Sequence, residues 1–259
     1  QMSAMESELN MQLFIRSNKG VKLTPAGAVM YQEFQALMDH YRRALKRGEM
    51  ASYGYSGTLK IGILSGMEIG VEIQDMIHQM SEKYPNVRME LKHFSHGEMV
   101  HALNRGELDL GVSIDLAFMG MQNVRYVNLR QCDPVLILSR NHPLAKREIL
   151  SYRDLKNEEL VVVKEGDCPA GEKLIVEECR KYGNFYPRLF YADSMEDAIL
   201  WVESGLKCAI FNTEMSFIHS PLSKYYILEE LKNKKSWIQA VYRRQNSNIA
   251  LSLALEYLE

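Results

Sequence analysis

The segment 25–47 constrains the fold most, because it joins a strong helix start to a single narrow apolar seam. Thr24 and Pro25 are residue types favoured at an N-cap and at the first helical position. The apolar residues that follow recur at spacings of 4, 3, 4 and 3, at Met30, Phe34, Leu37, Tyr41 and Ala44. This is the spacing of a coiled-coil seam, on a helix about 35 Å long.

A lone helix with one apolar seam needs a partner that covers the seam and excludes water from it. We therefore expect a homodimer, with the contact made by Met30, Phe34, Leu37 and Tyr41. Packing of the seam against the chain's own domain is the alternative. The sequence leaves open whether two dimers join as a tetramer.

Two smaller elements are expected in front of this helix. Apolar residues at helical spacing, including Met5 and Leu9, predict a short helix that ends by Asn10 or Met11. The basic, turn-rich stretch 16–20 lies between two extended arms and predicts a β-hairpin, or wing. Because the chain opens inside the helical pattern, we expect a further segment in front of residue 1.

Strands and helices alternate beyond a linker of glycines and serines at 48–57. Strands are expected at 58–64, Val87–Phe94, 109–114, 134–138, 160–163, 188–191, 208–211 and 238–242. Helices are expected after residue 69, at 98–105, 172–182 and 196–204, and at the C-terminus. This alternation is typical of α/β proteins with mostly parallel sheets. The length of the region fits two small sheets better than one.

The composition is that of an ordinary globular protein, with 46% hydrophobic and 25% charged residues and a formal net charge of −2. The four cysteines form no C-x-x-C pair, so neither a zinc knuckle nor a disulfide scaffold is indicated. No apolar run reaches the roughly 20 residues that cross a membrane, and the first residues lack a signal-peptide pattern. We expect a cytoplasmic protein with no membrane partner, no metal and no cofactor.

Three blocks near the start resemble those of LysR-type transcription regulators. They are SAMESEL at 3–9, LFIR at 13–16 and GVKLTPAG at 20–27, and they match the family's recognition-helix tail, wing and linker start in order and spacing. Asn10 stands where the family usually has glycine, and asparagine tolerates the same left-handed backbone.

The resemblance covers the whole chain. HPLA at 142–145, the helix that begins at Ser194 and the closing strand and helix all resemble segments of the family. Lys207 and Cys208 replace the usual glycine and isoleucine, and Phe211 and Asn212 stand where leucine and proline are common. These departures leave the fold intact but weaken any inference of the ligand from the family.

The resemblance implies a DNA-binding transcription regulator that a small effector controls, with double-stranded DNA, that effector and a second copy of the chain as partners. Residues 1–24 would be part of a winged helix-turn-helix, 25–56 the dimerisation helix with its hinge, and 57–259 the effector-binding domain. Phosphate contacts are expected from the wing, and the DNA-binding residues would be Ser3, Arg16, Lys19 and Lys22.

The effector-binding domain of the family is similar to periplasmic binding proteins, with a cleft between two Rossmann-like subdomains. Subdomain I would comprise 57–130 and 228–259, and subdomain II would comprise 131–227. The two crossovers between them would lie near 129–132 and 226–228.

Strand ends and helix starts indicate the cleft residues independently of the resemblance. Helix N-termini carry free N–H groups and a partial positive charge, which suit a carboxylate or phosphate. Strand ends also converge on clefts in α/β folds. We therefore expect a small anionic or polar effector, with Glu68 as a group that could repel an anion or select an amine. The expected effector-binding residues are Ser65, Gly66, Ser95, His96, Ser113 and Ser194. Ordinary helix capping by these serines is the alternative.

Three other functions compete with this interpretation. A stand-alone solute-binding protein would share the sensing fold but not the recognition-helix remnant. An enzyme is disfavoured because the sequence carries no nucleophile elbow, phosphate loop, dinucleotide turn or metal signature. A thiol- or peroxide-sensing regulator would use Cys168 and Cys179, which lie in a region resembling that of peroxide-sensing members, though at a different spacing.

Overall fold

The computed structural model describes residues 2–17, 20–53, 56–164 and 166–258. Contacts within the chain divide it into two compact units, Gln1–Tyr55 and Ser56–Glu259. Each unit is described by itself.

The first unit begins with helix α1 (Met2–Glu8) and a hairpin of β1 (Phe14–Ser17) and β2 (Gly20–Leu23). The two strands pair antiparallel, with Phe14 opposite Leu23, so the predicted wing is confirmed. Asn10 has a φ of 50°, the left-handed conformation expected where this chain has asparagine after the helix. Lys19, an expected DNA-binding residue, lies outside the described residues.

Three side-chain and backbone contacts hold α1, the hairpin and the next helix together. The Glu6 carboxylate accepts hydrogen bonds from the amides of Leu13 (2.7 Å) and Phe14 (2.9 Å), and these bonds lower the pKa of Glu6. Thr24 Oγ1 accepts from the Gly27 amide at 2.9 Å, which confirms Thr24 as a helix cap. A Cβ at Gly27 would lie 2.0 Å from the Leu13 carbonyl oxygen, so glycine is required there.

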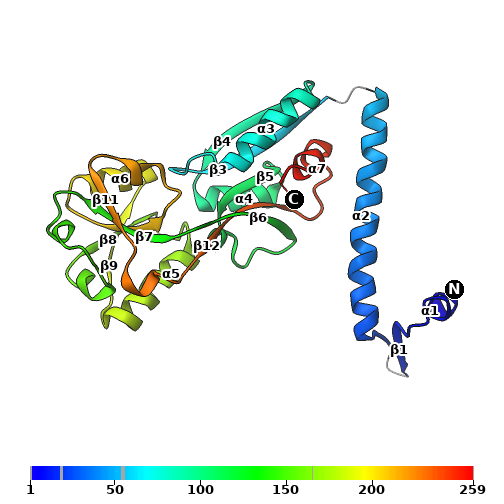
Figure 1. Cartoon of the computed structure of the whole chain (residues 1–259), viewed down its shortest axis with the longest axis horizontal. Coiled ribbons are helices and arrows are strands. Elements are labelled where there is room, and N and C mark those ends of the chain that lie inside the picture. Colours follow the sequence, from blue (N-terminus) through cyan, green and yellow to red (C-terminus); the bar gives the residue numbers. More distant parts are fainter. Residues whose placement is uncertain (1, 18–19, 54–55, 165, 259) are drawn as a thin grey trace. The chain divides into compact units, whose positions relative to one another are not determined.

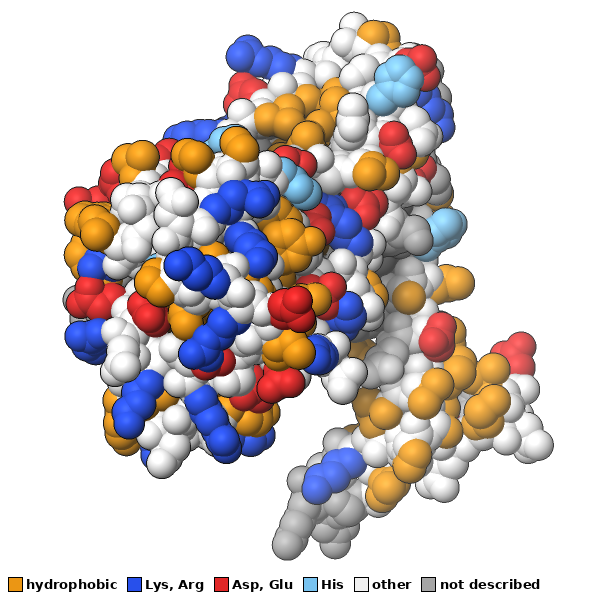
Figure 2. Space-filling view, turned by 60° about the vertical axis from the view of Figure 1, so that its left-hand side comes forward, with side chains coloured by type: hydrophobic (Ala, Val, Ile, Leu, Met, Phe, Trp, Pro, Cys, Tyr) orange, Lys and Arg blue, Asp and Glu red, His pale blue; other side chains and the backbone are white. Residues whose placement is uncertain are grey.

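Helix α2 (Pro25–Tyr53) extends beyond the predicted end at 47 and passes through Gly48 and Ser52. The expectation that these residues end the helix is wrong, because one glycine costs an interior turn only about 1 kcal/mol. The seam side chains are exposed in the single chain, with Phe34 40%, Leu37 64% and Tyr41 55% accessible. Figure 2 shows hydrophobic side chains gathered along this helix.

The second unit consists of two lobes (Figure 1). The first lobe is built on a five-stranded sheet in the order β4-β3-β5-β12-β6. Its strands are β3 (Gly57–Leu64), β4 (Val87–Phe94), β5 (Leu110–Ile114), β6 (Val124–Cys132) and β12 (Ser236–Arg243). Its helices are α3 (Val71–Lys83), α4 (His96–Arg105) and α7 (Ile249–Leu255). The edge strand β4 is half exposed, as its alternating sequence predicts.

The second lobe contains a sheet in the order β10-β7-β11 and a β8-β9 pair. An isolated parallel bridge between Leu160 and Cys208 joins the two. The strands are β7 (Pro134–Ser139), β8 (Glu159–Val163), β9 (Arg188–Ala192), β10 (Ala209–Asn212) and β11 (Ser223–Tyr226). The helices are α5 (Pro169–Glu178), which continues into a π-helical turn at Cys179–Gly183, and α6 (Met195–Glu203).

The sheets differ from the expectation of mostly parallel pairing. β3 pairs parallel with β4 and β5, whereas β12 pairs antiparallel with β5 and β6, and β7 pairs antiparallel with both its neighbours. The antiparallel strands β6 and β11 were not predicted. β6 leads out of the first lobe and β12 returns to it. Leu228 and Leu231 still pack in the core of the second lobe, so the chain returns later than the expected boundary at 228.

The exposed seam of α2 generates a prediction about assembly. Phe34→Lys combined with Leu37→Lys should halve the mass measured by light scattering, because two buried apolar contacts would become like charges facing each other. Gln32→Lys with Gln35→Lys adds the same charge away from the seam and should leave the mass unchanged. Equal masses for the seam variant and the unaltered protein would place the dimer contact elsewhere.

Candidate functional site

Two adjoining cavities lie between the lobes of the second unit. The larger has a volume of about 560 Å³ and the smaller about 200 Å³, and both are bordered by Leu64, His96, Val163 and Met195. The wall of the larger cavity is mainly aliphatic and aromatic. It includes Ile114, Leu116, Pro134, Val161, Leu174, Ile175, Ile210, Phe211, Met215 and Leu231.

Four of the six expected effector-binding residues line these cavities, and the other two, Gly66 and Ser113, lie next to residues that do. Ser65, Ser95, His96 and Ser194 line the smaller one. Ser113 is fully buried, and its Oγ lies 3.3 Å from His96 Nδ1. The Gly66 carbonyl accepts hydrogen bonds from the amide (2.8 Å) and hydroxyl (3.1 Å) of Ser216 in the other lobe. Their role toward a ligand stays a prediction.

Ser65 does not lie at a helix N-terminus, contrary to the expectation for an anion site there. Helix α3 begins at Val71, so no helix N-terminus follows Ser65 directly, and the Ser65 amide donates to the Phe94 carbonyl at 2.8 Å. Gly66 turns the chain with a φ of 77°, and a Cβ there would lie 2.5 Å from Met195 Cγ. Close packing of the two lobes therefore explains this glycine.

Ser95 caps α4 in the arrangement of a capping box with Glu98. The donors at this helix start are occupied by a carboxylate of the other lobe, that of Asp167. Ser95 Oγ donates to Asp167 Oδ1 at 2.8 Å, the His96 amide to Oδ2 at 3.1 Å and the Gly97 amide to Oδ1 at 2.9 Å. Sequence reasoning missed Asp167 because these contacts join residues 70 to 72 positions apart and leave no local pattern.

Ser194 also acts as a helix cap. Its Oγ accepts from the Asp197 amide at 3.1 Å and donates to the Asp197 carboxylate at 3.0 Å. Acidic side chains dominate the lining of the smaller cavity, namely Glu98, Asp167, Asp193 and Glu196, with Lys164 as the basic one among the described residues. These four carboxylates face the donors at which a small anionic or polar effector is expected.

His96 borders both cavities, and its imidazole is neutral. Burial lowers the pKa of His96, and the neighbouring Asp167 carboxylate opposes that shift only in part. At pH 7 its imidazole is therefore uncharged, and its ring exchanges a hydrogen bond with Ser113 rather than offering a positive charge to a ligand.

Both lysines at the wall of the larger cavity are already paired. Lys234 forms an ion pair with the buried Glu178, which also accepts a hydrogen bond from the Tyr152 hydroxyl. Lys235 pairs with Asp133 at 2.5 Å. The cavity thus presents a mainly apolar surface. Phe211 and Asn212, which depart from the family pattern, both line it.

Arg130 ties the lobes together beside the cavities. It lies on β6, and its guanidinium contacts Glu214 of the second lobe at 2.5 Å and Glu72 of α3 at 2.7 Å. A Cβ at Gly70 would lie 1.9 Å from Arg130 Nη1, so glycine leaves room for this bridge.

The two cysteines of the thiol-sensing alternative lie at opposite ends of α5. Cys168 precedes the helix and Cys179 follows it, and ten residues at 1.5 Å each separate the ends by about 15 Å. A disulfide needs Cα atoms closer than about 7 Å. Burial also raises the pKa of Cys179 to about 12 and raises the pKa of Cys168, which disfavours the reactive thiolates. The fold does not favour thiol sensing.

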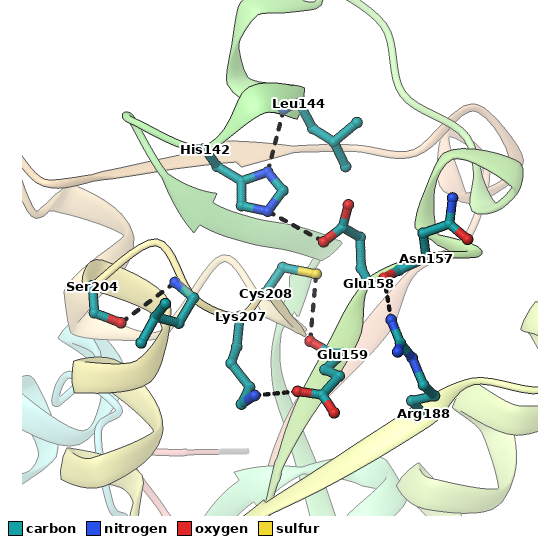
Figure 3. Close-up of polar contacts among 10 residues, drawn as sticks. His142, Leu144, Asn157, Glu158, Glu159, Arg188, Ser204, Lys207 and Cys208 are labelled. Atoms are coloured by element: carbon teal, nitrogen blue, oxygen red, sulfur yellow. Dashed lines mark hydrogen bonds and ion pairs between the residues drawn. The ribbon is translucent and has the colours of Figure 1, made fainter.

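The other two departures from the family pattern, Lys207 and Cys208, make contacts within the second lobe (Figure 3). Lys207 pairs with Glu159, and its Nζ lies 4.5 Å from the centre of the Phe190 ring. Cys208 is buried, with its Sγ 3.9 Å from the Glu159 carbonyl oxygen. His142 accepts from the Leu144 amide at 3.2 Å and contacts Glu158 at 3.3 Å, which accounts for the His-Pro-Leu segment.

The described residues contain no group of three or more His, Cys, Asp or Glu side chains arranged to hold a metal ion. None of the helices they form combines the length and apolar character needed to cross a membrane.

Comparison with known proteins gives a consistent result. A family model described as the LysR substrate binding domain matches residues 53–259. The HTH-type transcriptional regulator BudR of Raoultella terrigena is 26% identical over 249 residues, which cover 94% of this chain and 83% of BudR.

Two solved structures share the fold. Full-length CbnR complexed with its target DNA has a TM-score of 0.60 at 21% identity, covering 99% of this chain and 86% of that one. The effector binding domain of QuiR in complex with shikimate has a TM-score of 0.64 at 14% identity, covering 79% of this chain and 96% of QuiR. At these identities the likeness concerns the fold, and it confirms the predicted fold class.

Proposed function

This chain belongs to the LysR family of transcriptional regulators, and from that premise we propose that it binds double-stranded DNA as a homodimer and responds to a small molecule in the cleft between its lobes. The observation that carries the proposal is the presence, in one chain, of a wing, an exposed dimerisation seam and a two-lobed domain with cavities between the lobes. The protein acts in the cytoplasm, as a regulator rather than an enzyme.

In this proposal residues 1–24 bind DNA, residues 25–56 form the dimer contact, and residues 57–259 bind the effector. Arg16 is the best supported DNA contact, because its side chain is 59% exposed on the wing and its guanidinium donates to Ser3 Oγ at 3.2 Å. Lys22 is exposed on the neighbouring strand. The CbnR complex with target DNA supports this role by analogy of fold.

The two cavities favour an effector with an apolar body. Such a body fits the larger cavity, whose wall is mainly aliphatic and aromatic and whose two lysines are paired, and a polar group would lie near His96 at the shared border. Sites of this kind are mainly apolar, with a few polar groups that fix orientation. The shikimate complex of QuiR supports a small-molecule role for the fold.

Wing residues should govern the electrostatic part of DNA binding. Arg16→Gln and Lys22→Gln should each weaken binding to specific and unrelated duplexes alike, and each should reduce the slope of log K against log salt by about 0.9. Fluorescence anisotropy over a salt series measures both quantities. Lys173→Gln on α5, 76% exposed, is the matched control and should change neither. An unaltered slope in the wing variants would remove the wing from the DNA interface.

The cleft assignment can be tested once a thermal-shift screen of organic acids, amino acids and aromatics finds a ligand. Val163→Trp should abolish the ligand-induced shift because Val163 borders both cavities. Ser65→Ala should weaken binding about tenfold in calorimetry, as expected for one lost hydrogen bond to a charged or polar group. Ser81→Ala on the exposed face of α3 is the control. Normal affinity in both cleft variants would show that the ligand binds elsewhere.

A further inference from the structure

We propose that Asp167 is an internal latch of the cleft: its carboxylate occupies the hydrogen-bond donors at the start of α4 and holds the two lobes together until a ligand carboxylate replaces it. The inference rests on the proposed function, because it concerns the regulation of the same cleft.

The geometry is that of a bound carboxylate. Both oxygens of Asp167 are used, since Oδ1 accepts from Ser95 Oγ and the Gly97 amide and Oδ2 accepts from the His96 amide. Backbone N–H groups at the start of a ten-residue helix carry a partial positive charge, so they favour an anion. Ordinary capping needs only the Ser95–Glu98 pair, which is also present.

Gly97 points independently to a site shaped around this carboxylate. A Cβ at Gly97 would lie 2.9 Å from Asp167 Oδ1, which is closer than a side-chain carbon approaches an oxygen without a shift. Gly97 lies within a helix, where glycine is otherwise unfavourable. The close approach of the Asp167 oxygen gives a reason for its presence.

Two residues shortly before Asp167 have left-handed backbone. Lys164 has a φ of 45°, which is strained for a residue with a side chain, and Gly166 has a φ of 73°. The Lys164 amide donates to the Ala192 carbonyl at 2.8 Å and the Asp167 amide to the Lys164 carbonyl at 3.2 Å. These two hydrogen bonds tie Lys164 and Asp167 to the second lobe, from which the Asp167 carboxylate reaches α4.

The residues around Asp167 determine which carboxylates can displace it. Glu98, Asp193 and Glu196 line the same cavity and weaken the binding of a free anion, while Asp167 is tethered and competes at a high effective concentration. Small carboxylates alone should therefore fail to displace it. A carboxylate whose apolar body fills the adjoining larger cavity gains the additional binding that displacement requires.

The first test removes the latch and supplies an external carboxylate. In Asp167→Ala, the His96 and Gly97 amides should exchange with solvent at least about tenfold faster than in the unaltered protein, since each loses a hydrogen bond to a charged group. Sodium acetate, compared with sodium chloride at equal ionic strength, should slow this exchange and raise the melting temperature of Asp167→Ala. It should do neither in the unaltered protein or in Asp193→Ala, which removes another carboxylate of the same cavity.

A second variant keeps Asp167 and places a methyl group where its carboxylate binds at the start of α4. In Gly97→Ala the new Cβ should push the carboxylate away, so the His96 amide should exchange as in Asp167→Ala while the helix itself gains stability. Unchanged exchange in both variants, or equal effects of acetate on all proteins, would overturn the latch. These measurements need neither DNA nor effector. By contrast, a screen that finds no ligand for either the unaltered protein or Asp167→Ala would count against the proposed function.

Discussion

The path of the chain between the two lobes is the constraint on which the rest of the second unit depends. β6 carries the chain out of the first lobe and β12 brings it back, and the two strands pair side by side from 124 to 132 and 236 to 243. Because the lobes are otherwise built on separate sheets, the space between them becomes a cleft whose walls can move apart. Arg130 and Asp167 then decide how tightly that cleft is held.

Local patterns accounted for much of the fold. The wing, the Thr24 cap and the alternation of strands and helices follow from turn residues, capping residues and apolar periodicity, which act over a few positions. The antiparallel strands β6 and β11 were missed because their pairing is decided by partners far away in the sequence. Helix α2 passes through Gly48 because one glycine in a long helix costs only about 1 kcal/mol, which the neighbouring helical residues outweigh.

In the candidate site, too, the local features could be predicted from the sequence and the long-range contacts could not. Serines at strand ends and helix starts could be found from the sequence, and the structure places Ser65, Ser95, His96 and Ser194 around one cavity. The charge of that cavity could not be found, because Asp167, Asp193 and Glu196 come from the second lobe and meet α4 only after the chain has crossed over. The sequence predicts a simple anion site. The structure instead has a mainly apolar cavity next to helix donors that the Asp167 carboxylate already occupies.

The central claim is that occupancy of the cleft and binding of DNA are coupled, which requires that each ligand change the affinity for the other by the same factor. The most direct measurement is the affinity for the regulated DNA site, by anisotropy at fixed salt, with and without a saturating cleft ligand. A coupling of typical size changes that affinity by about fivefold or more, and the ligand's affinity should change equally when DNA is saturating. Identical DNA affinities in the two conditions, with the ligand shown to be bound, would contradict the account.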